Sequence, residues 1–405
     1  METTPTSGAA QDSTESRLFN VETGQDRATT PGVDNHSIHT FGNGKSPRPC
    51  LSHSSTEKHA APDSSAARER LPGSIPTAQK SNDVTIRAYT PADDPQLMEL
   101  ERLCPRGEPR PFVHFRRRFI DRAMLYTNPY LFIAEKNGMP VGVTSIAIKD
   151  THIGGDAVRV AYSFDTRVHP RFRRQGIANA MQEEKLAFLR SQGVHGMYAY
   201  VVSTNFASIK MLEKIGVHKV RMILYLNFTP YPIIIPPMED PQEHDEPNEQ
   251  ALIDRIFGER DLYIASMAQS VASYSLHRYT LDRGDIPVGI SIFDQSLVYQ
   301  QISADEPWPS EEEISKRART LRVFNETGIK DAEGLRTVFD HVRDIAVVSN
   351  VSHLSWIIDR SDPVPGFLFE EATAQKDYWM MFEPLLPDWE PQWTNKPIYI
   401  DARDL

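Results

Sequence analysis

Apolar and polar residues alternate along several stretches in the first part of the chain, which is the pattern of half-buried β-strands. One such stretch runs from Val158 to Val168. Two others flank Asn137-Gly138, a pair typical of tight hairpin turns because both residues tolerate positive φ. The predicted strands are 84–89, 130–135, 141–148, 158–168, 198–202 and 217–228.

Helical periodicity fills the intervals between these strands. The clearest helix spans Gln175 to Gln192. Residues 205–214 show a similar period and end before Gly216, which suits the left-handed position after a helix. Earlier helices are predicted at 91–103 and 112–125. One side of the clearest helix is apolar, at Ile177, Met181, Leu186 and Leu189.

This order of elements predicts an α/β (α+β) fold, with a mixed twisted sheet flanked by helices. Residues 1–83 are rich in Ser, Thr, Pro and Gly and show neither period, so a disordered tail is expected. The first domain is expected at 84–229. Residues 230–250 are acidic and Pro-rich, which is typical of an exposed linker, and a second α+β domain is expected at 251–405.

The second domain repeats part of the order of the first. A hairpin, a helix and a strand are predicted, with a final strand closing the chain. A degenerate copy of the first domain and an unrelated α+β domain both remain open on this pattern. The predicted segments are 275–281, 287–293, 334–348, 352–359 and 397–401.

Composition argues against several classes of protein, among them nucleic-acid-binding, disulfide-rich and membrane-spanning proteins. The formal charge of −11 over 405 residues gives no general attraction to nucleic acid, so direct nucleic-acid binding is not expected. Two cysteines cannot build a disulfide framework, and no Cys/His spacing indicates a metal site. With no apolar run of membrane-spanning length and no secretory signal, a cytoplasmic or nuclear location is expected.

The turn between the strand at 158–168 and the helix at 175–192 carries the strongest chemical signal. Its sequence contains three arginines and a glycine at the point where the chain enters the helix. A helix N-terminus exposes unpaired backbone N–H groups and favours an anion. The motif Arg173-x-x-Gly176-x-Ala178 therefore indicates a phosphate site, although an ordinary strand–helix corner also fits these few residues.

Motif and element order together resemble the GNAT superfamily of N-acetyltransferases over about Val84 to Phe228. In that family an Arg/Gln-x-x-Gly-x-Gly/Ala segment binds the pyrophosphate of acetyl-CoA. Ala161-Tyr162, Arg167-Val168 and the run 173–177 are similar to the HOOKLESS-type acetyltransferases of plants, which carry a C-terminal extension of similar size. The second domain lacks this segment. The resemblance therefore favours a degenerate GNAT-like fold for that domain.

The resemblance implies a set of contacts for acetyl-CoA, with no metal. Main-chain atoms of Thr166 and Val168 are expected to meet the pantetheine arm. Asn205 is expected at the cofactor or as the cap of its helix, two roles that are compatible. The phosphates are expected at Arg173, Arg174, Gln175, Gly176, Ile177 and Ala178.

The catalytic residues depart from the family pattern. Tyr162 matches a position where histone acetyltransferases of the superfamily carry a glutamate base. Because tyrosine is a poor base at its usual pKa of about 10, Tyr162 is a candidate for hydrogen bonding or for positioning water. Strict alternation puts it on the face of Thr166 and Val168, with Asp165 opposite. The tyrosine that usually protonates the thiolate is replaced by Leu212.

Two functions of different class follow from these residues. The first is an acetyl-CoA-dependent N-acetyltransferase that transfers an acetyl group to an amine acceptor. The second is a regulatory protein that binds acyl-CoA on a retained GNAT fold with little turnover. The intact motif at 173–178 favours the first, and Leu212 favours the second.

Overall fold

The computed structural model describes residues 80–405, with gaps at 82, 108, 233–238 and 245–248. The predicted tail 1–83 therefore lies outside the described residues except near its end, and so does part of the predicted linker 230–250. In the described part of that linker, Gln242–His244 form a short strand, β9, which pairs with β10 (His277–Leu281).

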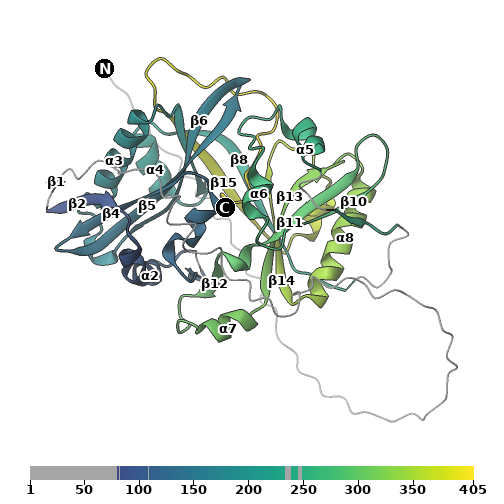
Figure 1. The fold of residues 1–405 in the computed structure, drawn as a ribbon, viewed down its shortest axis with the longest axis horizontal. Coiled ribbons are helices and arrows are strands. Elements are labelled where there is room, and N and C mark those ends of the chain that lie inside the picture. The colour runs from purple at the N-terminus through teal and green to yellow at the C-terminus, as the bar shows by residue number, and fades with distance from the viewer. Residues whose placement is uncertain (1–79, 82, 108, 233–238, 245–248) are drawn as a thin grey trace, which may run out of the picture. The chain divides into compact units, whose positions relative to one another are not determined.

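One mixed sheet of 13 strands organises the described residues (Figure 1). Its order is β1-β2-β4-β5-β6-β7-β15-β8-β14-β13-β11-β10-β9. Strands β3 and β12 form a separate two-stranded sheet. The remaining bounds are Lys80–Ser81 (β1), Val84–Ala88 (β2), Phe112–Phe115 (β3), Pro129–Lys136 (β4), Met139–Ile153 (β5), Asp156–Val168 (β6), Gly196–Val202 (β7), His218–Phe228 (β8), Val288–Asp294 (β11), Gln300–Ser303 (β12), Arg319–Thr327 (β13), Val351–Asp359 (β14) and Ala374–Pro384 (β15).

Helices pack on both faces of the sheet. The apolar side of α3 lies in one cluster with β2, β4 and β5, as its predicted stripe requires. On the other face, α2 and the short 3-10 helix η2 pack over β4, β5 and β6. These features confirm the expected mixed α/β fold. The bounds are Asp94–Arg102 (α2), Phe119–Leu125 (η2), Ile177–Ser191 (α3), Phe206–Lys214 (α4), Gln250–Phe257 (α5), Met267–Val271 (α6), Glu311–Lys316 (α7), Ala332–Val348 (α8) and Phe367–Glu371 (α9).

The two halves of the sheet exchange their last strands. Strand β8 follows β7 in the sequence but pairs with β14. Strand β15 follows β14 but pairs with β7. The two exchanged strands also pair with each other. Because backbone groups inside a sheet need ladder partners, each half relies on a strand from the other to complete its hydrogen bonding.

The second half repeats the order of the first, as the weak echo in the sequence predicted. The hairpin β10–β11, the strand β13, the helix α8 and the parallel strand β14 correspond to β4–β5, β6, α3 and β7. A non-glycine residue with positive φ follows the last parallel pair in both halves. These residues are Asp165, with φ of 51°, and Asn325, with φ of 49°.

Two sequence predictions of secondary structure are wrong. The helix expected at 112–125 is strand β3 followed by η2. Its aromatic and β-branched start favours a strand, but the partner strand β12 lies far along the chain and leaves no local signal. The strand expected at 397–401 joins no ladder among the described residues; Ile398 and Tyr399 instead insert into the core.

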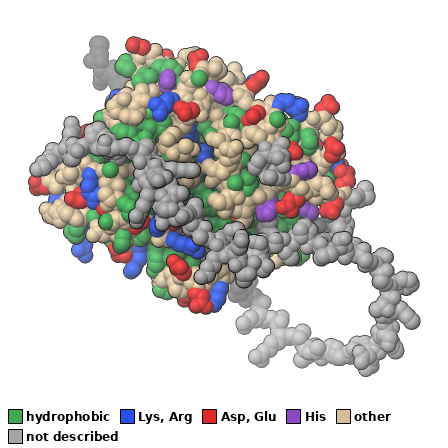
Figure 2. Space-filling view, in the orientation of Figure 1, with side chains coloured by type: hydrophobic (Ala, Val, Ile, Leu, Met, Phe, Trp, Pro, Cys, Tyr) green, Lys and Arg blue, Asp and Glu red, His purple; other side chains and the backbone are tan. Residues whose placement is uncertain are grey.

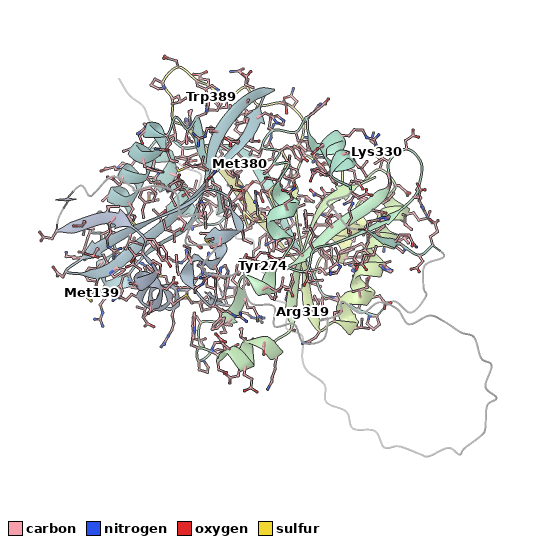
Figure 3. All side chains as sticks on the ribbon, viewed as in Figure 1. Met139, Tyr274, Arg319, Lys330, Met380 and Trp389 are labelled. Atoms are coloured by element: carbon pink, nitrogen blue, oxygen red, sulfur yellow. The ribbon has the colours of Figure 1, made fainter. Side chains whose placement is uncertain are left out.

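The central position of β15 gives a stability prediction. Met380 on β15 is fully buried, whereas Met139 is 54% exposed at the β4–β5 hairpin (Figure 3). Met380→Ala should lower the free energy of unfolding by about 2–5 kcal/mol through lost burial and a cavity. Met139→Ala is the matched control and should change it by less than about 0.5 kcal/mol. Chemical denaturation measures both; equal effects would contradict a central β15.

Candidate active site

Strands β6 and β7 diverge after a short parallel contact. Their pairing ends at Tyr162 and Tyr198. The register between β6 and β5 shifts just after Phe164, where Asp165 has a φ of 51°. Such an inserted residue bends its strand and interrupts the ladder. We use the name fork for the gap that opens between β6 after Tyr162 and β7 after Tyr198.

The bulge also changes which side chains share a face, so the assignment from strict alternation is wrong. Asp165 lies on the face of Tyr162, not opposite to it. Both contact Arg122, whose Nη1 lies 3.1 Å from Asp165 Oδ1 and whose Nη2 donates to the Tyr162 hydroxyl at 3.3 Å. Thr166 is exposed, and Val168 packs against the α3 side of the sheet.

A buried ion-pair network holds this bulge. Arg116 donates to Asp165 Oδ2 at 2.8 Å and to Glu101 at 3.0 Å, and Arg167 reaches Glu101 at 3.0 Å. Burial alone would raise the pKa of Asp165, but Arg116, Arg122 and Arg167 outweigh it and hold that pKa well below its usual range. Arg116 itself is only 2% exposed, so its charge is compensated by these carboxylates rather than by solvent.

The loop before α3 has the geometry of an open anion site. Gly176 is the N-cap of α3 with φ of 80°, and an added Cβ there would meet nothing within 4 Å. Arg173, Arg174 and Gln175 are exposed, whereas the Ile177 side chain is buried, leaving only its backbone for a ligand. Backbone N–H groups at such a terminus attract an anion.

A large cleft of about 1700 Å³ continues from the fork. Small-molecule pockets usually measure roughly 300–1,000 Å³, so this cleft has room for an extended ligand and a second substrate. Its wall includes the predicted residues Tyr162, Thr166, Ala178 and Asn205. The exchanged strands β8 and β15 and the segment before β12 add aromatic lining that the sequence did not indicate, at Tyr225, Tyr378 and Tyr299.

Helix α4 borders the same cleft. The side-chain oxygen of Asn205 accepts a hydrogen bond from the Ser208 backbone N–H at 3.2 Å, which makes Asn205 the predicted N-cap. Leu212 lines the cleft and packs against a cluster that contains Ile209. Ile215, which follows the last turn of α4, is 41% exposed. No phenol therefore occupies the α4 position where the family carries its acid.

Tyr162 contacts a segment that sequence reasoning did not place at the site. Its hydroxyl donates to the main-chain oxygen of Asp404, and Arg122 donates to that same oxygen at 2.7 Å. Burial raises the pKa of Tyr162 far above its usual range, with Arg122 opposing the shift. The phenol therefore keeps its proton, which excludes Tyr162 as a base.

The Asp404 side chain completes a buried cluster beneath the fork. Its carboxylate accepts from the Tyr198 hydroxyl at 2.6 Å and from Lys149, which also reaches Asp401 at 2.8 Å. Tyr126 donates to the main-chain oxygen of Arg403 at 2.8 Å. These contacts bridge more than 200 positions along the chain, so no local sequence pattern could reveal them.

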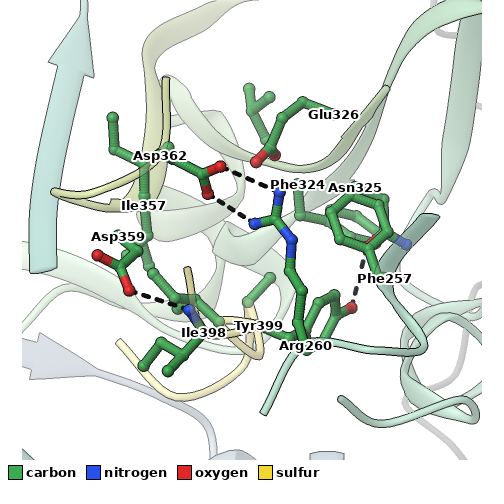
Figure 4. Close-up of a pocket in the computed structure, with 14 residues that line it drawn as sticks. Phe257, Arg260, Phe324, Asn325, Glu326, Ile357, Asp359, Asp362, Ile398 and Tyr399 are labelled. Atoms are coloured by element: carbon green, nitrogen blue, oxygen red, sulfur yellow. Dashed lines mark hydrogen bonds and ion pairs between the residues drawn. The ribbon is translucent and has the colours of Figure 1, made fainter. Parts of the chain in front are cut away.

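The corresponding gap in the second half is filled. Parallel pairing of β13 and β14 ends at Val323 and Trp356. Beyond them, Phe257, Ile398 and Tyr399 line a space of only about 20 Å³, roughly enough for one water (Figure 4). A pantetheine arm cannot enter a space of this size.

Polar contacts close the second gap further. Arg260 binds Asp362 through two hydrogen bonds of 2.6 and 3.0 Å, and Tyr399 donates to Asn325 at 2.9 Å (Figure 4). At the start of α8, Asp331 accepts from the Gly334 backbone N–H at 2.9 Å. A carboxylate thus occupies the helix N-terminus where a phosphate would need to bind.

The described residues contain no group of three or more His, Cys, Asp or Glu side chains that could hold a metal ion. Within the same residues, no helix has the length and apolar character to cross a membrane. On the face drawn in Figure 2, acidic and basic side chains are interspersed. Local contacts rather than a field of one sign would therefore position a charged ligand there.

Comparisons with known proteins agree with this geometry. Residues 95–217 match the model of the acetyltransferase (GNAT) family. No curated protein matches the sequence. A GCN5-related N-acetyltransferase from Sphaerobacter thermophilus shares the fold, with a TM-score of 0.51 and 15% identity over 78% of this chain and 100% of that chain. A tandem GNAT protein from the clavulanic acid biosynthesis pathway has a TM-score of 0.48 and 12% identity, covering 76% and 100%.

The closer similarity to HOOKLESS-type proteins stays a prediction. At 15% identity the Sphaerobacter thermophilus structure shows a common fold, while the family model covers the segment that contains the fork and the loop before α3. Residues 95–217 are thus similar to the acetyltransferase (GNAT) family, and the described residues share the fold of a GCN5-related N-acetyltransferase.

Proposed function

We propose that the protein is an acetyl-CoA-dependent N-acetyltransferase whose cosubstrate binds in the fork. The observation that carries this proposal is the open fork beside a glycine-capped helix N-terminus. The fork offers unpaired strand edges to an extended chain bearing amides, and the loop at Gly176 offers backbone N–H groups to phosphates. The second half repeats the strand order but offers neither feature among the described residues.

The predicted cofactor residues take distinct roles in this proposal. Main-chain groups of Thr166 and Val168 hold the pantetheine arm, and the loop from Arg173 to Ala178 holds the pyrophosphate. Arg173 Nε now donates to the Val168 carbonyl oxygen at 3.2 Å. That contact must yield when the arm binds, which frees the guanidinium for a phosphate. Asn205 caps α4 and faces the cleft, where it can meet the cofactor as well.

Acetyl transfer needs a neutral amine beside the thioester carbonyl carbon. The amine nitrogen forms a bond to that carbon, the carbon–sulfur bond breaks, and the amine proton leaves. Tyr162 cannot take this proton because its phenol stays protonated. We assign it a positioning role, since its hydroxyl fixes the Asp404 main chain at the cleft wall. CoA thiol has a pKa near that of cysteine, about 8.5, so a dedicated acid is helpful rather than obligatory.

The competing function is an acyl-CoA-binding regulatory protein without turnover. Leu212 supports it, because that side chain cannot protonate a thiolate. The size of the cleft supports the enzyme, because space remains for an acceptor after an extended cosubstrate binds. Half-buried Tyr200, Tyr225 and Tyr378 line that remaining space and suit an amine with an apolar body.

Gly176→Glu should weaken acetyl-CoA binding by on the order of 100-fold or more. The new carboxylate would repel the pyrophosphate and obstruct its approach to the backbone. Gly193→Glu is the matched control: Gly193 also has positive φ, of 65°, and open space, but it follows the far end of α3. Calorimetry with both variants measures the difference. Equal affinities in two folded variants would remove the pyrophosphate from this loop.

Tyr162→Phe should lower kcat by about 10-fold or more if Tyr162 positions reacting groups, with little change in acetyl-CoA affinity. The pH–rate profile should keep its shape, because Tyr162 does not titrate in the ordinary pH range. Leu212→Tyr should raise the rate if that position faces the thiol. CoA release with a panel of amines, including peptide N-termini and lysine peptides, measures both.

The same assay separates the two functions. If the protein binds acetyl-CoA but releases no CoA above background with any amine, it is an acyl-CoA-binding protein rather than an N-acetyltransferase. Unchanged kcat in Tyr162→Phe would keep the enzyme and remove Tyr162 from its mechanism.

A further inference from the structure

Lys185 is a buried amine at the vertex of the fork. It lies on α3, is 3% exposed and lines the cleft. Its Nζ donates to the Ser163 Oγ at 2.8 Å. Ser163 directly follows Tyr162, where the parallel pairing with β7 ends. The amine therefore lies where an extended chain that follows β6 from the loop before α3 would reach its end.

The surroundings of Lys185 favour its neutral form. Burial lowers the pKa of Lys185 to about 7, and the carboxylate of Glu383 only partly opposes this shift. Glu383 is shared with Arg190, which lies 3.7 Å from it. At pH 7 about half of the Lys185 side chains then carry a free lone pair, against roughly one in 2,500 for a lysine at its usual pKa of about 10.4.

Another buried lysine near the fork shows the contrast. Lys149 contacts the carboxylates of Asp401 and Asp404 and the Tyr198 hydroxyl. Lys149 thus has three polar partners, and two of them are carboxylates. The hydrogen-bond partner of Lys185 is a hydroxyl. Acetyl transfer to an external amine, as proposed above, does not require Lys185.

We propose that Lys185 is a self-acetylation site of this chain, modified by the acetyl-CoA that the fork binds. The inference rests on the proposed function. The Lys185 nitrogen forms a bond to the thioester carbonyl carbon, the carbon–sulfur bond breaks, and CoA leaves as the thiolate. The proton released from nitrogen passes to that thiolate, directly or through the Ser163 hydroxyl. The products are N-acetyl-lysine and CoA thiol, and no further reactant is needed.

Acetylation at Lys185 would regulate the same site. The amide cannot be charged, so its attraction to Glu383 is lost, and the acetyl group adds bulk at the vertex of the fork. Well-packed surroundings tolerate added volume poorly. Acetylated chains should therefore bind acetyl-CoA more weakly, which makes the modification self-limiting.

The test follows isotope-labelled acetyl-CoA into the full chain by peptide mass spectrometry. Lys210, exposed on α4, is the internal control for chemical acetylation. At pH 7, labelling of Lys185 should exceed that of Lys210 by about 10-fold or more. The excess should shrink towards pH 9, because the neutral fraction of Lys185 is nearly complete there, whereas that of a lysine with the reference pKa of about 10.4 is still rising.

Variants show whether the fork directs the modification. Gly176→Glu should abolish labelling of Lys185 and leave the slow labelling of Lys210, whereas Gly193→Glu should preserve both. Labelling of Lys185 that is no faster than that of Lys210, or that survives in Gly176→Glu, would overturn the inference. If the protein acetylates an external amine while Lys185 stays unlabelled, the inference is overturned and the proposed function stands. A wild-type chain that fails to bind acetyl-CoA would overturn the proposed function itself.

Discussion

The fork depends on one buried carboxylate, that of Asp165. This residue adopts a left-handed backbone conformation that is unfavourable for a side chain other than glycine by roughly 1–2 kcal/mol. Its side chain is 1% exposed, and its carboxylate is held by Arg116 and Arg122. Removing one partner of such a buried pair typically costs about 3–5 kcal/mol, which is enough to keep the strained residue in place. The bulge it fixes separates β6 from β7.

The second half shows what happens when a similar gap is filled. Asn325 has the same backbone conformation as Asp165, and β13 and β14 also stop pairing near it. Tyr399 and Ile398 fill the gap, and Asp331 caps the following helix. The exchanged strands β8 and β15 join this half to the first, and its tyrosines line the cleft. The second half thus contributes to the wall of the site rather than a second site.

Local patterns predicted much of this molecule. The strand at 158–168, the apolar stripe of α3 and the capping role of Asn205 each depend on neighbouring residues, and the structure contains all three. The position of Gly176 at the start of α3 was also visible, because strand, turn and helix signals adjoin there.

Long-range contacts set the limit of prediction. The faces of Asp165 and Thr166 could not be read from alternation, because the bulge depends on arginines that lie more than 40 positions away. Strand β3 requires its partner β12, and Tyr162 meets Asp404 across 242 positions. The burial of Lys185 could not be predicted from the sequence. A lysine on an amphipathic helix is usually solvated, and only tertiary packing buries this one.

The stoichiometry of acetyl-CoA binding tests the central claim most directly. In each chain the fork between β6 and β7 is open, and the corresponding gap between β13 and β14 is filled. Isothermal titration calorimetry of the full chain with acetyl-CoA should therefore give one site per chain. Two sites per chain would contradict the filled second gap, and the absence of any binding would contradict the open fork as an acetyl-CoA site.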